Sequence, residues 1–83
     1  GVPTATIARS EIEEGIGIIN ALAAKTGFLA SNGQARRELK GNAISVNKTK
    51  VKEDFTITSE QLINDQFVLL GKGKKNNYLI VVE

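Results

Sequence analysis

The 83-residue sequence contains no cysteine and no histidine. The absence of cysteine rules out disulfide bonds, thiolate metal sites and cysteine nucleophiles. The absence of histidine removes the commonest general base, the commonest metal ligand and every catalytic arrangement of the Ser-His-Asp or Cys-His kind. Functions that depend on these side chains are therefore excluded within this chain.

Proline, aromatic residues and long apolar runs are also scarce. Pro3 is the single proline, and there are three phenylalanines and one tyrosine. The longest apolar runs, such as residues 67–70, are far too short to span a bilayer, and residues 1–11 carry no signal peptide. With 41% apolar and 24% charged residues, the composition predicts one small soluble domain with no membrane partner.

The carboxylates do not form an acid–base pair. Glu11, Glu13 and Glu14 lie where a helix is expected to begin, a position that acidic side chains stabilise. Glu53 and Asp54 are adjacent, so on a strand they would point to opposite faces. No cluster has metal-ligand spacing, and we therefore expect no catalytic residue, no metal and no cofactor in this segment.

Positive charge is concentrated in two segments, although the net charge is only +2. Residues 25–52 carry seven basic side chains against Glu38 alone, whereas residues 53–71 carry four acids and no base. Lys72, Lys74 and Lys75 then follow together. Clustered positive charge on a small domain favours a polyanionic partner, with a merely solvated charged surface as the alternative.

The N-terminal third predicts an extended segment followed by a helix. We expect residues 1–10 to be an extended lead-in from an upstream linker, because Pro3 disfavours helix in the residue before it and β-branched residues follow. Apolar residues at helical spacing predict one helix over residues 11–25, with Ser10 and Glu13 as a capping box and Gly27 as the stop.

A second, shorter helix carries a cluster of basic side chains. Ser31 and Gln34 form a second capping box, and Gly41 is expected to end the helix in a left-handed conformation. Residues four apart share one helix face, so Arg36 and Lys40 are expected to lie together, with Arg37 on the same polar side.

The C-terminal half predicts strands. Residues 43–46 alternate as a strand, residues 47–50 form a tight turn, and residues 67–70 and 78–82 form a hairpin joined by the basic segment GKGKKNN. Helices followed by strands indicate an α+β domain. The expected architecture is two N-terminal helices packed on a small, mostly antiparallel sheet that ends in a basic hairpin.

The few aromatic residues do not favour a surface for stacking bases. We expect Phe28, Phe55 and Phe67 to lie in the core, and only Tyr78 to make a polar contact. Single-strand binders usually stack bases on exposed aromatics. Arginine and lysine on the second helix and the following turn suit phosphate contacts instead, which points to structured RNA recognised by shape and backbone.

The segment IINALAAKTGFLASNGQARRELKGNAISVNKTKV, residues 18–51, resembles a small RNA-binding domain first described in a small-subunit ribosomal protein and often called the alpha-L motif. Its hallmarks are a serine cap, an Ala-Arg-Arg helix, a glycine stop and a Val-Asn turn. The matching residues are Ser31, Ala35, Arg36, Arg37, Gly41, Val46 and Asn47. The flanks VPTATIARSEIEEGIGIINAL and FVLLGKGKKNNYLIVVE are similar to the C-terminal domain of bacterial-type tyrosyl-tRNA synthetases.

This resemblance implies a tRNA-binding accessory domain, residues 11–83, of a cytoplasmic, homodimeric tyrosine–tRNA ligase. The partner would be tyrosine tRNA, and the catalytic domain, which would use ATP and magnesium, would lie upstream in the same chain. Carried over residue by residue, the RNA-binding positions would be Ser31, Arg36, Arg37, Lys40, Asn47, Lys48, Lys50, Lys72, Lys74 and Lys75.

Two alternatives stay open at this point. The same module could serve a ribosome-associated or RNA-modifying protein, or the basic face could meet an acidic protein domain. Three residues also depart from the motif: Gly33, Gln34 and Lys48. The last replaces the glycine of an Asn-Gly turn, where a lysine at positive φ would be strained by about 1 kcal/mol.

Overall fold

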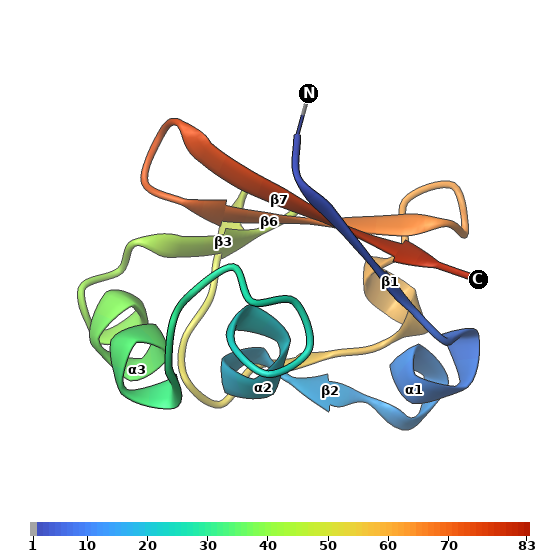
Figure 1. Ribbon diagram of the computed structural model, residues 1–83, viewed down its shortest axis with the longest axis horizontal. Coiled ribbons are helices and arrows are strands. Elements are labelled where there is room, and N and C mark those ends of the chain that lie inside the picture. The colour runs from blue at the N-terminus through green and yellow to red at the C-terminus, as the bar shows by residue number, and fades with distance from the viewer. Residues whose placement is uncertain (1) are drawn as a thin grey trace.

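The structure is a computed structural model that describes residues 2–83. All three α-helices lie in the first half of the chain, and one face of the larger sheet carries them (Figure 1). The elements are β1 (Thr4–Ile7), α1 (Arg9–Glu14), β2 (Ile16–Gly17), α2 (Ile18–Leu22), α3 (Asn32–Lys40), β3 (Ile44–Val46), β4 (Thr49–Lys50), β5 (Thr56–Ile57), a 3-10 turn (Ser59–Gln61), β6 (Phe67–Lys72) and β7 (Asn76–Val82).

The larger sheet has five strands in the order β1-β7-β6-β3-β4. Strands β3, β4, β6 and β7 pair antiparallel, whereas β1 runs parallel to β7. A second sheet of two short strands pairs β2 with β5. The predicted α+β fold, mostly antiparallel and ending in a basic hairpin, is confirmed.

The core lies between the larger sheet and the helices. Alternate residues of the central strands, Ile44, Val46, Val68, Leu70 and Ile80, are buried against the helices. From the other side, the helices bury residues at helical spacing, namely Ile12, Ile18, Ala21, Leu22, Ala35 and Leu39. Within the described part of the chain no polar or charged residue is buried, so the fold rests on apolar packing.

The single helix predicted over residues 11–25 is wrong, because the structure divides it at Gly15. Gly15 adopts φ 100°, ends α1 and leads into β2, whose backbone pairs with β5. A helix interior disfavours glycine by about 1 kcal/mol, and Gly15 and Gly17 flank the break. The Ser10–Glu13 capping box is also absent: α1 begins after Ala8, with no side-chain cap.

The segment expected as an extended lead-in forms the parallel edge strand β1. Thr4 to Ile7 pair with Leu79 to Val82, and Ile7 is buried. Residues 4–7 are extended as expected but are integrated into the sheet, whereas Arg9 and Ser10, expected to be extended, already belong to α1.

Two turns differ from expectation in detail. Gly41 has φ −78°, and Asn42 takes the left-handed conformation in its place with φ 60°. The final hairpin turn is shorter than GKGKKNN, because β6 continues through Lys72 and β7 begins at Asn76. Gly73, with φ 68°, supplies the positive φ of this tighter turn.

Candidate nucleic-acid interface

The turn between β3 and β4 presents Lys48 on a strained backbone. Val46 pairs with Thr49, so Asn47 and Lys48 form a two-residue hairpin loop. Their φ values are 51° and 71°, which is the type I′ pattern that favours Asn-Gly. Lys48 therefore occupies a left-handed position that costs a non-glycine residue about 1–2 kcal/mol.

The side chain of Asn47 is engaged inside the fold. Its Nδ2 donates to the Gln61 carbonyl at 2.7 Å, and its Oδ1 accepts from the Leu69 backbone N–H at 2.9 Å. The Asn47 N–H also donates to the Leu69 carbonyl at 2.7 Å. Asn47 thus fixes the turn to β6, and both polar atoms of its side chain are engaged within the fold.

Three lysines surround one shallow hollow at the hairpin ends of the larger sheet. The hollow has a volume of about 440 Å³. Its lining residues come from β3, β4, the β3–β4 turn and the β6–β7 hairpin, and they are Ser45, Lys48, Lys50, Gly73, Lys74 and Asn77. No acidic residue lines it, so the ammonium groups are available to phosphate oxygens, with a hydroxyl and an amide beside them.

Two residues that line this hollow, Ser45 and Asn77, lie on either side of Gly71. Ser45 pairs with Gly71 across the sheet, and Gly71 pairs with Asn77. A Cβ atom at Gly71 would lie only 2.7 Å from Ser45 Oγ and 3.5 Å from Asn77 Oδ1. The missing side chain lets these two polar groups approach each other between the lysines.

Helix α3 presents its basic residues on another side of the molecule. Its first turn is capped by Ser31, whose Oγ accepts from the Gln34 N–H at 3.1 Å. The Gln34 side chain accepts from Ala30 rather than from Ser31, so the predicted capping box is only half formed. Arg36, Arg37 and Lys40 are all exposed.

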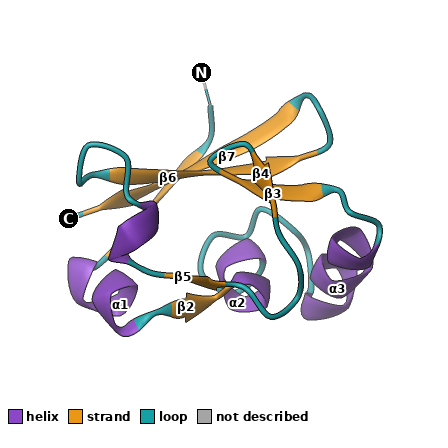
Figure 2. Ribbon diagram, turned by 180° about the vertical axis from the view of Figure 1, so that it is seen from behind, coloured by secondary structure: helices purple, strands orange, loops and turns teal. Residues whose placement is uncertain are grey.

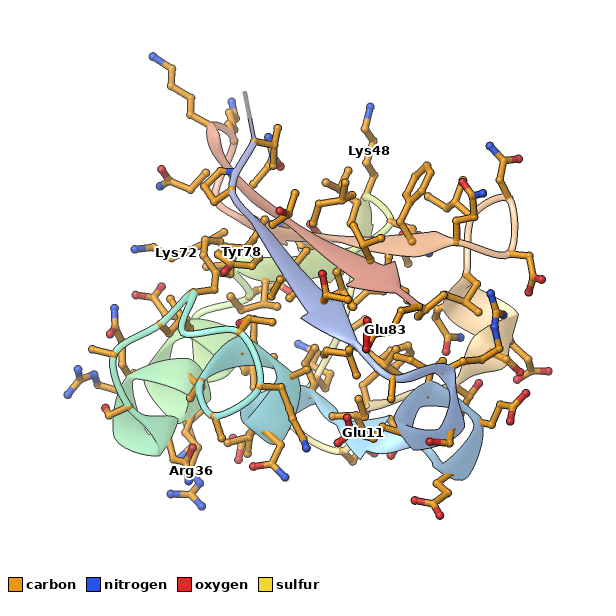
Figure 3. All side chains as sticks on the ribbon, turned by 45° about the vertical axis from the view of Figure 1, so that its right-hand side comes forward. Glu11, Arg36, Lys48, Lys72, Tyr78 and Glu83 are labelled. Atoms are coloured by element: carbon orange, nitrogen blue, oxygen red, sulfur yellow. The ribbon has the colours of Figure 1, made fainter. Side chains whose placement is uncertain are left out.

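Arg36 and Lys48 point in opposite directions, Arg36 away from the sheet and Lys48 outward from its far side (Figure 3). Lys40 lines a separate hollow with Lys52, Glu53 and Asp54. Helix α3 and the β6–β7 turn lie at the same end of the molecule (Figures 1 and 2), whereas Lys48 lies away from that end (Figure 3). The basic positions that the resemblance implies therefore do not share one face.

The remaining hairpin lysines differ in their surroundings. Lys72 turns toward the helices, and its Nζ lies 4.0 Å from a carboxylate oxygen of Glu38 on α3. That ion pair offsets part of its charge. Lys75 is exposed at the tip of the turn beside Lys74. The structure thus brings together Lys48, Lys50 and Lys74 most closely, with Ser45 and Asn77 as neighbours that sequence reasoning missed.

Several acidic residues lie around α1, at the other end of the molecule from α3 (Figure 1). Lys25 donates a hydrogen bond to Glu11 and lies beside it, and both effects lower the pKa of the Glu11 carboxyl below its usual value. Arg9 pairs with Asp65 at 2.9 Å. Near α1, Arg9 and Lys25 are therefore already paired with acids.

Of the aromatic residues expected in the core, only two pack there. Phe28 and Phe55 lie partly buried against it, and the Tyr78 ring is 5.3 Å from Phe28. The Tyr78 hydroxyl donates to the Thr26 carbonyl at 2.9 Å, a polar contact within the fold.

The prediction for Phe67 is wrong: it alternates with buried Val68 and lies half-buried on the opposite face of the sheet.

Residues 2–83 hold no group of three or more histidine, cysteine or carboxylate side chains arranged to bind a metal ion. Over the same residues, no helix has the length and apolar character needed to cross a membrane.

The chain matches the family model of the tyrosine–tRNA ligase SYY-like C-terminal domain over residues 1–80. It is 56% identical over 82 residues to a tyrosine–tRNA ligase of Flavobacterium johnsoniae, covering 99% of this chain and 19% of that protein. It is 40% identical over 80 residues to a tyrosine–tRNA ligase of Rhodopseudomonas palustris, covering 95% of this chain and 19% of that protein. The chain thus spans about a fifth of the length of the curated relatives it matches.

Proposed function

The chain belongs to the tyrosine–tRNA ligase SYY-like C-terminal domain family, and from this premise we propose that it is the tRNA-binding accessory domain of a cytoplasmic tyrosine–tRNA ligase. The longer protein joins tyrosine to tyrosine tRNA and works as a homodimer. ATP and magnesium are used by its catalytic domain, outside these residues. This chain contributes binding and no catalytic group.

One observation of the structure supports the proposal most strongly. Lys48, Lys50 and Lys74 converge on a hollow that no acid lines, in a molecule whose net charge is only +2. Such a local excess of positive charge suits a polyanion, and lysines on a sheet edge contact phosphates without reading bases.

The proposed mechanism is docking of structured RNA through its backbone. The β3–β4 turn is held to β6 by Asn47, so Lys48 projects from a fixed position. Arg36 and Arg37 on α3 provide a second set of contacts on another face, where a guanidinium group can hold a phosphate through two hydrogen bonds. The two faces together suit an RNA that contacts the domain on more than one side.

The proposal is tested by titrating fluorescently labelled tyrosine tRNA with the chain at several salt concentrations. Each phosphate contact contributes about 0.7–0.9 to the slope of log affinity against log salt. The Lys48→Ala/Lys50→Ala double variant is expected to reduce that slope by roughly 1.5. A Lys25→Ala/Lys52→Ala double variant removes the same charge elsewhere and is expected to leave the slope nearly unchanged.

Two further binding measurements test the role of α3 and the preference for tyrosine tRNA. Arg36→Ala/Arg37→Ala should weaken binding too, and unchanged affinity with an intact fold would remove α3 from the interface. A tRNA without a long variable arm should bind more weakly than tyrosine tRNA. If no RNA binds, the proposed tRNA-binding role is refuted. If both lysine pairs reduce the slope equally, the assignment of the interface to Lys48 and Lys50 is refuted.

A further inference from the structure

The larger sheet has a face that no helix covers. In Figures 1 and 2 the three α-helices lie on one side of β6 and β7, and the opposite side is open over residues 2–83. Buried Val68, Leu70 and Ile80 point toward the helices. Because successive strand residues point to opposite faces, the residues between them point to the open side.

The open side carries a compact apolar patch, which consists of Phe67, Leu69, Leu79 and Val81. Phe67 pairs with Val81, and Leu69 pairs with Leu79, so the four side chains lie as two adjacent cross-strand pairs. All four are half-buried, and none of them packs against the core cluster. Phe67 is the only aromatic residue of the patch.

Positive charge borders this patch. Asn47 is joined to Leu69 by hydrogen bonds to both its N–H and its carbonyl. The next residue, Lys48, therefore stands beside the patch, and its side chain projects on the open side (Figure 3). Lys50 and Lys74 follow along the same face, around the hollow that no acid lines.

We propose that this face binds unpaired nucleotides, with a base stacked on the ring of Phe67 and the neighbouring phosphates held by Lys48 and Lys50. The proposal rests on the proposed RNA-binding function and adds a second kind of contact to it. Stacking on an aromatic side chain accepts any base, since every base has a π-face. An apolar sheet surface with one aromatic and adjacent lysines matches how sheets bind single-stranded RNA.

The charge distribution favours RNA over a second copy of the chain. A symmetric contact between two copies buries the same patch on both. It would bring the lysines of both copies toward one interface, where like charges repel. RNA supplies the opposite charge at the same positions.

The test compares a single-stranded RNA of about ten nucleotides, carrying one 2-aminopurine, with a fully paired RNA duplex. The Phe67→Leu variant keeps an apolar β-strand side chain but removes the aromatic face. We expect it to bind the single strand about tenfold more weakly and the duplex with unchanged affinity. Phe67→Tyr should retain single-strand binding and the change in 2-aminopurine fluorescence.

The matched control is Phe28→Leu, the same substitution on the helix side, and it should leave single-strand affinity unchanged. Circular dichroism and thermal melting verify that each variant is folded. Equal single-strand affinity for wild type and Phe67→Leu would overturn the base-stacking proposal while leaving tRNA docking intact. If Phe67→Leu instead changes only the self-association of the chain, measured by sedimentation, the base-stacking proposal is overturned too. That result would assign the face to a second copy.

Discussion

Replacing Lys48 with glycine separates the charge of this residue from its backbone strain. At φ 71° a side chain costs about 1–2 kcal/mol, which glycine does not incur. Glycine in turn gives the unfolded chain more freedom, which lowers stability by roughly 0.5–1 kcal/mol. The balance predicts that Lys48→Gly raises the free energy of unfolding by about 0.5–1 kcal/mol.

A gain of about 1 kcal/mol corresponds to an increase in melting temperature of roughly 4–8 °C for a domain of this size. Lys48→Ala keeps the strain and should leave stability nearly unchanged. Lys50→Gly, on the neighbouring strand β4, should lower stability by about 0.5–1 kcal/mol. The two variants at position 48 should weaken tRNA binding equally, because both remove the same ammonium group.

Urea unfolding gives the stabilities, and anisotropy titration gives the affinities. A Lys48→Gly variant that is no more stable than Lys48→Ala would refute the assignment of strain at this turn. Unchanged tRNA affinity in both variants would refute the assignment of Lys48 to the interface.

Three further predictions concern the fold that supports this surface. Asn47→Ala should lower the free energy of unfolding by about 2–4 kcal/mol, because the Leu69 N–H and the Gln61 carbonyl lose their partner; a change below roughly 0.5 kcal/mol in urea unfolding would show that the turn is held by other contacts. Gly71→Ala should cost about 1–3 kcal/mol, since its Cβ would lie 2.7 Å from Ser45 Oγ, and Ser45→Gly should restore much of that loss. If Ser45→Gly does not restore the stability lost in Gly71→Ala, the clash lies elsewhere. The lowered pKa of Glu11 means that its ion pair with Lys25 stabilises the fold above the unfolded-state pKa, and this contribution is lost as pH falls through the lower folded-state value. Glu11→Gln should therefore lose stability less steeply than wild type on the acid side, which melting curves recorded at a series of pH values would show. Parallel curves for the two proteins would contradict the pairing.

The helix-capping residue and the strands of the C-terminal half could be predicted because their signals are local. Ser31 caps α3 as its spacing indicated, and the alternation of Ile44 and Val46 placed β3 correctly. The motif residues together with the two flanks also indicated the family. These features depend on a few adjacent side chains, which the sequence displays directly.

The division of the first helix could not be predicted from apolar spacing. Ile12, Ile16 and Ile18 are buried in both arrangements, so the pattern did not distinguish one helix from two short helices with a strand between them. The pairing of β2 with β5 decides it, and that contact joins residues about forty positions apart.

At the site, the directions in which the basic side chains point could not be predicted from the sequence. Helix periodicity places Arg36 and Lys40 relative to each other, but it does not say on which side of the sheet the helix packs. Lys48 points to the opposite side of the sheet from Arg36 (Figure 3). The run Phe67 to Leu70 likewise has no polar alternation, so nothing in it revealed which residues face the open side.

The most direct test of the account is an NMR titration of the ¹⁵N-labelled chain with tyrosine tRNA, read residue by residue. The account predicts that the largest amide shifts occur at Lys48, Lys50 and Lys74, with Glu13 and Glu14 of α1 unchanged. Shifts concentrated on α1, with the lysines of the hollow unmoved, would contradict it.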